Sequence, residues 1–213
     1  MRIGIIGATG NAGRALFNEA TKRGHDTTAI VRSAAKAAEI LGADAAVLER
    51  DAFSVTSDDL TAFDVVVNAF GTAPDQAHQH VDLARSLVER AVAGGPRLVF
   101  ILGAGSLTTG DDDHLFVEDI RNFPGAEAWI SIPENQLKEL EFLRGVTDAD
   151  WVGVSPSAMF VPGEASEPVL GNDRLLYAGD GESHTTTGTM AVAILNEIEQ
   201  PAHRQTRFTV SDS

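Results

Sequence analysis

A short apolar run that ends in a glycine-rich turn opens the chain and most constrains its fold. The residues from Ile3 to Ile6 have the composition of a buried strand, three glycines follow within seven residues, and a helical pattern comes next. Gly7 permits a sharp turn, Gly10 lets backbone amides approach a pyrophosphate, and Gly13 allows close packing of helix on strand. The free N–H groups and dipole of the following helix favour phosphate. The sequence therefore predicts a dinucleotide-binding turn rather than an ordinary connection.

Short apolar runs alternate with helical patterns along the rest of the chain. Apolar and β-branched composition predicts further strands at residues 27–31, 45–48, 63–71, 98–102, 150–155 and 207–210. Spaced apolar residues predict helices that end near Gly24, Gly42, Ala62, Gly145 and Gln200, and another over 75–93. Residues 107–124 are expected to form a polar, acidic excursion. This alternation predicts an α/β fold, a doubly wound parallel sheet of the Rossmann type with helices on both faces.

Length and composition limit the classes of protein that the chain can represent. The 213 residues suit one domain, with a core over 1–156 and an irregular, substrate-side region over 157–213. The lack of cysteine excludes thiolate chemistry and suits a cytoplasmic location. We expect no signal peptide, and no apolar run approaches the ~20 residues of a membrane span. A formal charge of −15 disfavours nucleic acid and anionic membranes as partners.

Ligands of open α/β sheets bind outside the carboxyl ends of the strands. The residues that follow the predicted strands should therefore line one rim of the sheet. They are the glycine turn, Arg32, Asp51 to Phe53, Asn68 to Gly71, Gly103 to Ser106 and Pro156 to Phe160.

The order of these motifs resembles the atypical short-chain dehydrogenase/reductases. Within them it is most similar to the NmrA-like and biliverdin reductase B-like group, and to bacterial proteins described as NADH-flavin reductases. The resemblance runs nearly end to end, through residues 5–13, 29–32, 64–71, 103–107, 141–144, 154–158 and 207–210.

The resemblance implies a cofactor site along the rim, and the spacing of the histidines and acidic residues themselves indicates no metal site. The pyrophosphate loop would be Gly7, Ala8, Thr9, Gly10, Asn11, Ala12 and Gly13, and the adenosine-phosphate contacts Arg32 and Ser33. Asp51, Ala52 and Phe53 would line the adenine, and Asn68, Ala69, Phe70 and Gly71 the central part of the cofactor. The nicotinamide end would be lined by Gly103, Ala104, Pro156, Ser157, Ala158 and Met159.

One departure from the family pattern concerns the general acid. Typical short-chain dehydrogenases carry Tyr-x-x-x-Lys, in which the lysine lowers the pKa of the tyrosine for acid-base work. Here Lys138 fits the lysine, but Glu134 stands in the place of the tyrosine, and the only tyrosine, Tyr177, lies far along the chain. Alcohol oxidation or sugar epimerisation through that tyrosine is therefore not expected.

Two residues are candidates for direct chemistry. Ser106 would polarise a substrate carbonyl or orient the nicotinamide, or else bond local backbone as a turn serine. Lys138 would contact cofactor hydroxyls, or else be a solvated helix lysine, the commoner state of lysines.

Other polar and aromatic residues have simpler interpretations. His78 and His80 are spaced i, i+2, so on a helix their rings point apart and both are expected to be solvated. The run from Asp111 to His114 lacks a metal-ligand spacing and is expected to be an acidic surface loop. Trp129 and Phe160 are candidates for stacking on a flat substrate, with core or lid packing as the alternative for Trp129.

Arg32 bears on the choice of cofactor. NAD-binding proteins usually carry an acid about 20 residues after the glycine turn, where this chain has Arg32. A guanidinium can pair with a 2′-phosphate and stack on adenine, whereas the nearby Asp26 should lie at the far end of its strand. We therefore expect NADP(H) to be preferred, with NAD(H) as the alternative if Arg32 is simply solvated.

The leading functional hypothesis is hydride transfer from NADPH to a flat conjugated acceptor such as a flavin or quinone. This chemistry requires alignment of two rings and no strong protein acid. The alternative is a non-catalytic, NmrA-like sensor of NADP(H) whose occupancy alters a surface for a protein partner. A sugar or steroid dehydrogenase or epimerase is the weakest alternative, because the tyrosine is missing.

Overall fold

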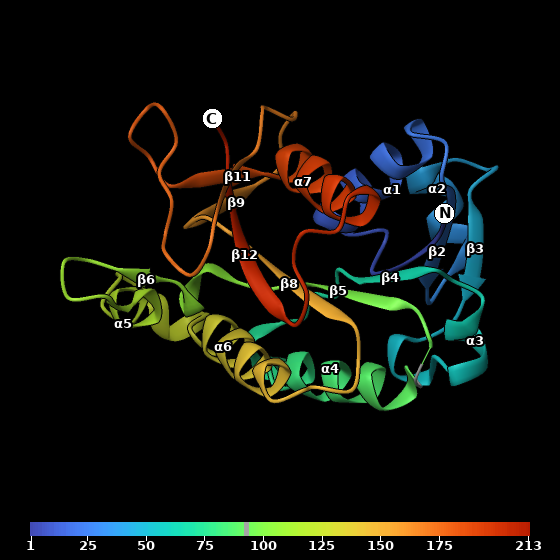
Figure 1. Ribbon diagram of the computed structural model, residues 1–213, viewed down its shortest axis with the longest axis horizontal. Coiled ribbons are helices and arrows are strands. Elements are labelled where there is room, and N and C mark those ends of the chain that lie inside the picture. Colours follow the sequence, from blue (N-terminus) through green and yellow to red (C-terminus); the bar gives the residue numbers. More distant parts are fainter. Residues whose placement is uncertain (92–93) are drawn as a thin grey trace.

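The computed structural model describes residues 1–91 and 94–213 and has an eight-stranded sheet at its centre (Figure 1). The strand order is β10-β12-β8-β5-β4-β1-β2-β3. All neighbours in it run parallel except β10, which pairs antiparallel with β12. The order reverses direction between β1 and β4, so helices cover both faces. The predicted doubly wound α/β fold is confirmed.

The strands of the central sheet are short and mostly buried. They are β1 (Arg2–Ile6), β2 (Asp26–Val31), β3 (Ala46–Glu49), β4 (Val65–Asn68), β5 (Arg97–Ile101), β8 (Trp151–Pro156), β10 (Val169–Gly171) and β12 (Thr206–Ser211). Two small two-stranded sheets flank it, formed by β6 (Thr108–Thr109) with β7 (His114–Leu115) and by β9 (Met159–Val161) with β11 (His184–Thr186).

The helices divide between the two faces and bury two apolar cores. They are α1 (Asn11–Lys22), α2 (Ala34–Leu41), α3 (Ser57–Thr61), α4 (Gln79–Arg90), α5 (Phe116–Arg121), α6 (Ser131–Arg144) and α7 (Thr187–Glu199). One core joins α1, α2 and α7 to one face of the sheet, and the other joins α3, α4 and α6 to the opposite face. In Figure 1, α1 and α7 lie on one side of the sheet and α4 and α6 on the other. Within the described residues, no helix is long and apolar enough to cross a membrane.

Two segments differ from the sequence prediction. The helix expected over 75–93 is split into a short 3₁₀ turn at Pro74–Gln76 and α4, and residues 92 and 93 lie outside the described residues. The excursion over 107–124 is not wholly polar, because it contains β6, β7 and the short helix α5, which buries Phe116 and Ile120. Its acidic turn at 111–113 is exposed, as expected.

The C-terminal strands were only partly predicted. The strand at 207–210 is confirmed as the centre of β12, which pairs with β8 and so extends the parallel sheet. The short strands β9, β10 and β11 were missed, because three residues are too few to show a periodic pattern. The irregular C-terminal region is thus tied to the core through a strand and the helix α7.

The first turn is held by a backbone contact that only glycine permits. Gly7 has a φ of +75°, a left-handed conformation that other residues adopt rarely. A Cβ on Gly13 would lie 2.3 Å from the carbonyl oxygen of Gly7, far inside van der Waals contact. The two glycines therefore let the first turn of α1 rest directly on the end of β1.

We predict that Gly13→Ala destabilises the protein. Overpacking against rigid backbone costs about 1 to 3 kcal/mol, more than the ~1 kcal/mol that alanine gains over glycine inside a helix. Urea unfolding should show a lower midpoint than in Gly71→Ala, where an added Cβ meets nothing within 4 Å. Equal midpoints for the two variants would contradict the proposed packing.

Candidate functional site

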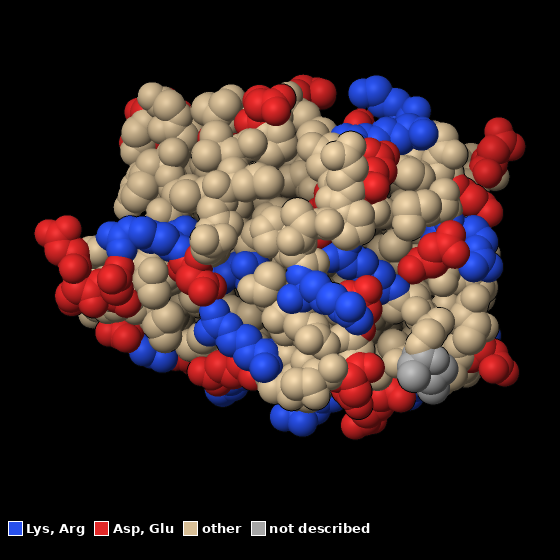
Figure 2. Space-filling model, viewed as in Figure 1, with Lys and Arg blue, Asp and Glu red and all other residues tan. Residues whose placement is uncertain are grey.

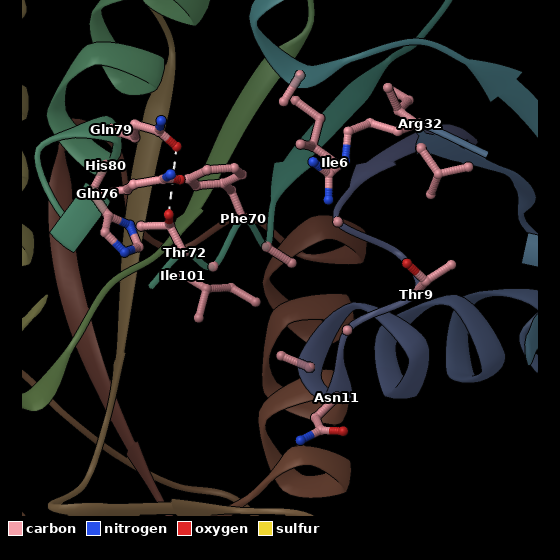
Figure 3. Close-up of a pocket in the computed structure, with 18 of the residues that line it drawn as sticks. Ile6, Thr9, Asn11, Arg32, Phe70, Thr72, Gln76, Gln79, His80 and Ile101 are labelled. Carbon is pink, nitrogen blue, oxygen red and sulfur yellow. Dashed lines mark hydrogen bonds between the residues drawn. The ribbon is translucent and has the colours of Figure 1, made fainter. Parts of the chain in front are cut away.

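The main cleft lies at the carboxyl ends of β1, β2, β4 and β5, where the sequence placed the rim. Its volume is about 840 Å³, and its walls come from the first turn, the residues after these strands, and the N-terminal parts of α4 and α6. Figure 3 shows its two sides, with Arg32 on one, His80 and Gln79 on the other, and Phe70 between them. The cleft is therefore long and has chemically different ends.

The glycine turn presents backbone donors to the middle of the cleft. Gly10 is the N-cap of α1, in an extended conformation and with no side chain to cap the helix. The first amides of α1 thus have no capping partner within the described residues, which is the arrangement that binds phosphate. Thr9 and Asn11 line the cleft beside them, whereas Ala8 is buried.

One end of the cleft carries three basic side chains. Arg32 follows β2, Lys36 lies on α2, and Arg50 follows β3. Arg50 donates to Asp59 over 3.1 Å, but its buried Nε has no hydrogen-bond partner in the described chain. Ser33 is not among the lining residues. Its side chain caps α2 by accepting a hydrogen bond from the amide of Lys36 over 3.3 Å. This end is suited to an anionic group.

Aromatic and small residues form the wall between the basic end and the middle. Asp51 caps a 3₁₀ turn (Ala52–Ser54), which places Ala52 and Phe53 against the cleft. The Phe53 ring meets Phe70 edge to face, with ring centroids 5.9 Å apart. Ala69 and Gly71 also line the cleft. Asn68 does not, but its side-chain oxygen accepts a hydrogen bond from the amide of Phe70 over 3.2 Å and so holds this segment in place.

The opposite end of the cleft has no charged side chain among its described lining residues. Apolar contacts come from Ile101, Leu102, Ile132 and Phe160, and polar ones from Thr72, Gln76, Gln79, Gln136 and His80. Thr72 donates to the Gln79 amide oxygen over 3.4 Å, as drawn in Figure 3. This end offers amide donors and acceptors beside flat apolar surface.

Several of the predicted site residues lie outside the cleft walls. Gly103 does not line the cleft but leaves room for Gln136, which does, because a Cβ on Gly103 would stand 2.1 Å from the side-chain oxygen of Gln136. Ser157 is fully buried and donates to the carbonyl of Val210. Gly13, Ala104, Pro156, Ala158 and Met159 also stay outside the lining, and from β9 only Phe160 reaches it.

The structure places Ser106 in a buried polar cluster. Its side chain is 4% exposed, donates to the carbonyl of Gly103 over 3.3 Å and accepts from Arg207 over 3.2 Å. Arg207 also donates to Ser155 and forms an ion pair with Asp173. These contacts correspond to the alternative of a turn serine bonding local backbone, and they tie β12 to the loop after β5.

Lys138 and the single tyrosine also lie outside the described lining of the cleft. Lys138 is exposed on α6, and Tyr177 is 59% exposed. Glu134, which occupies the place of the family tyrosine, forms an ion pair with Arg121 over 3.0 Å. Trp129 lies outside the lining too. The structure thus brings no tyrosine and lysine together in the cleft.

His80 is buried, so the expectation that both histidines are solvated was wrong for this residue. It is 3% exposed, lines the cleft and packs edge to face on Phe70, whereas His78 is exposed. Burial lowers the pKa of His80 to about 4 and raises the pKa of Glu139, on α6, well above its usual range. The sequence spacing showed that the two rings diverge but not that α6 packs over one of them.

Other cleft residues were also missed by sequence reasoning. They are Lys36, Arg50, Thr72, Ala73, Gln76, Gln79, Ile132 and Gln136. Lys36 and Arg50 flank predicted residues on α2 and after β3, so proximity to Arg32 and Asp51 was an available signal. The glutamines carried no such signal, because their role depends on how α4 and α6 close over the sheet.

Charge is unevenly spread over the surface. On the face drawn in Figure 2, basic side chains cross the middle of the molecule and acidic ones lie mainly around the outline. The acidic turn is itself paired, since His114 contacts Asp112 over 2.6 Å and Asp119 over 3.0 Å. These two carboxylates raise the pKa of His114 to about 9.

Comparisons with known proteins agree with this geometry. The model of a family described as NAD(P)H-binding matches residues 7–200. The uncharacterised protein YwnB of Bacillus subtilis (strain 168) is 39% identical, over 99% of this chain and 98% of its own length. These matches, with the two structures below, confirm the resemblance to the atypical short-chain dehydrogenase/reductases.

Two solved structures share the whole fold. A protein from Lactobacillus casei is 38% identical with a TM-score of 0.93, and the match covers 100% of both chains. A protein from Streptococcus pneumoniae TIGR4, described as a candidate NADH-flavin reductase, is 30% identical with a TM-score of 0.89, again over 100% of both chains.

We predict that Gly10→Val abolishes dinucleotide binding and leaves the apo fold intact. An added Cβ would meet only the Gly7 carbonyl, at 3.3 Å, but the valine methyls would occupy the approach to the helix amides. Calorimetric titration with NADPH should show at least a hundredfold weaker binding. Asn18→Val, on the exposed side of α1, is the control and should bind normally. Unchanged affinity in Gly10→Val would remove the pyrophosphate site from this turn.

Proposed function

We propose that this chain, which belongs to the NAD(P)H-binding family, is a reductase that passes hydride from NADPH to a flat conjugated acceptor such as a flavin or quinone. The observation that carries the proposal is the cleft itself. It joins a phosphate-binding turn and a basic end to an uncharged end lined by aromatic, aliphatic and amide groups. This arrangement suits a dinucleotide and a flat acceptor lying along one cleft.

The residues present fit a dinucleotide of this kind. The uncapped amides of α1 suit the pyrophosphate, and at the basic end the buried Nε of Arg50 has no hydrogen-bond partner in the described chain. Nicotinamide would supply hydride from its C4 atom. The chain would align the rings between Phe70, Ile101 and Gln136 and exclude water from between them.

The missing tyrosine supports acceptor reduction over alcohol chemistry. In typical short-chain dehydrogenases a tyrosine beside a lysine exchanges a proton with the substrate alcohol or carbonyl oxygen. Glu134 is held in an ion pair with Arg121, and Tyr177 lies outside the cleft. The description of the pneumococcal relative as a candidate flavin reductase also supports a flavin-like acceptor.

The basic end of the cleft supports a preference for NADPH over NADH. Arg32 and Lys36 line the cleft where the second strand ends, the usual place of the adenosine ribose. The Ala34 amide at the α2 N-terminus already donates to Glu49 over 3.3 Å, so a 2′-phosphate would depend on the basic side chains rather than on this amide. A planar guanidinium matches phosphate in two-point geometry.

Turnover and binding should be measured separately to test the function. NADPH consumption would be followed with a panel of flavins, quinones and carbonyl compounds, and NADPH affinity by calorimetry on the same protein. We expect turnover with at least one flavin or quinone and none with simple carbonyls. Tight NADPH binding without turnover on any acceptor would contradict the proposal and favour the sensor.

We predict that Arg32→Asp weakens NADPH much more than NADH. A charge-assisted hydrogen bond contributes about 1.5 to 3 kcal/mol, or roughly ten- to a hundredfold in affinity. Arg204→Asp, a charge-matched change at an exposed arginine paired with Asp150 over 3.7 Å, is the control. Titrations that show equal affinity of the unmodified protein for both cofactors, or equal loss of both in Arg32→Asp, would overturn the preference.

We predict that Tyr177→Phe leaves acceptor reduction within twofold of the unmodified protein. The phenol is exposed and is not among the described residues that line the cleft, so it is not expected to donate to an acceptor bound there. Steady-state rates with a flavin and a quinone provide the measurement. A loss of ~10²-fold or more, the usual contribution of a general acid, would show that the tail supplies the proton.

A further inference from the structure

A buried acid with no partner lies behind the uncharged end of the cleft. Glu139 is on the inner face of α6 and is 1% exposed. Within the described chain, neither of its carboxyl oxygens has a hydrogen-bond partner. A leucine would fill an apolar helix interface without this penalty, so packing alone does not explain a carboxyl group here.

The nearest polar group is the ring of His80. Its Nδ1 lies 3.8 Å from Oε2 of Glu139, too far for a hydrogen bond but within reach of a small side-chain movement. The ring also packs on Phe70, with centroids 5.8 Å apart, and lines the cleft. His80 therefore stands between the buried acid and the space where an acceptor would lie.

The charge states of the two groups suit proton donation at neutral pH. Burial lowers the pKa of His80 to about 4, so its ring is neutral. Burial also raises the pKa of Glu139 well above its usual range, which favours the protonated carboxyl group. In these charge states the pair is neutral and offers a carboxyl proton in Glu139 and an N–H in His80, both on buried side chains.

From this juxtaposition we infer that His80 is the proton donor to the acceptor, and that Glu139, acting through His80, is the proton reservoir behind it. The inference rests on the proposed reductase function and deepens it. It assigns to this cleft an uncharged acceptor that must take up a proton as well as a hydride, such as a quinone or an oxidised flavin. The lining amides of Gln79 and Gln136 complement carbonyl or imide groups on such a ring.

The steps balance as a two-electron reduction. The C–H bond at C4 of NADPH breaks, and the hydride carries its electron pair to the acceptor, which becomes an anion while NADPH is oxidised to NADP⁺. The His80 Nε2–H bond then breaks and its proton joins the acceptor anion. In the same step His80 Nδ1 takes the proton of Glu139, so the ring stays neutral. After product release a solvent proton restores Nε2–H from the cleft, and the Nδ1 proton returns to the Glu139 carboxylate. Catalytic hydrogen bonds are often long before substrate binds, so the 3.8 Å separation fits this sequence.

Two acceptors that differ in their need for a proton test the assignment. Menadione, a naphthoquinone, requires hydride and proton, whereas 5-methylphenazinium becomes neutral on accepting hydride alone. We expect His80→Gln to slow menadione reduction about 10²-fold, to leave phenazinium reduction within threefold, and to leave NADPH affinity unchanged. Glu139→Gln, nearly isosteric, should show the same selectivity, and it keeps the test available if His80→Gln folds poorly. His78→Gln, an exposed histidine two residues earlier, is the matched control.

A solvent isotope effect gives a readout that a packing defect would not produce. In D₂O the unmodified protein should reduce menadione more slowly, with little change for phenazinium. Equal losses on both acceptors, or no loss in either variant, would overturn the role of the pair while the reductase function stands. An unmodified protein that reduces neither acceptor would overturn the proposed function and this role with it.

Discussion

The contact between Gly13 and the carbonyl of Gly7 is the constraint on which the rest of the site depends. A side chain on Gly13 would push α1 away from the end of β1, and a side chain on Gly7 would meet the Ala69 carbonyl at 2.6 Å in a left-handed backbone conformation. Because both are glycine, the uncapped N-terminus of α1 lies at the carboxyl end of β1, beside the point between β1 and β4 where the strand order changes direction. The close approach fixes where a phosphate can bind, and the parallel strands on either side then determine which residues line each half of the cleft.

The two halves differ because they come from different parts of the doubly wound fold. Strands β2 and β3 deliver Arg32 and Arg50 to one end, beside Lys36 on α2. Helices α4 and α6 pack together over the other end, to which they bring the amides of Gln79 and Gln136 and the buried His80, with the buried Glu139 behind it. A bound dinucleotide would thus have its charged part among cations and its reactive ring in an uncharged, drier site, where a neutral proton donor costs least to bury.

The sequence predicted what depends on local pattern and missed what depends on packing between helices. Buried strands such as β4 and β5 and the glycine turn were recognised from composition and spacing, and most rim residues after β1 to β4 do line the cleft. His80 was misread because helical spacing shows the direction of a ring but not the element it faces. Short strands such as β9 gave no periodic signal. The sequence placed all of Pro156 to Phe160 on the rim, whereas in the structure only Phe160 lines the cleft. Ser106 and Lys138 were candidates for direct chemistry with a turn serine and a solvated lysine as the alternatives, and the structure shows Ser106 buried beside Arg207 and Lys138 exposed.

A crystal structure of the protein with NADPH and an unreactive flavin or quinone analogue tests the account most directly. The account predicts the pyrophosphate on the amides of α1, the 2′-phosphate within hydrogen-bond distance of Arg32, and the analogue stacked on the nicotinamide with a polar atom facing His80. A dinucleotide bound in the reverse direction, or an analogue held away from the end formed by α4 and α6, would contradict it.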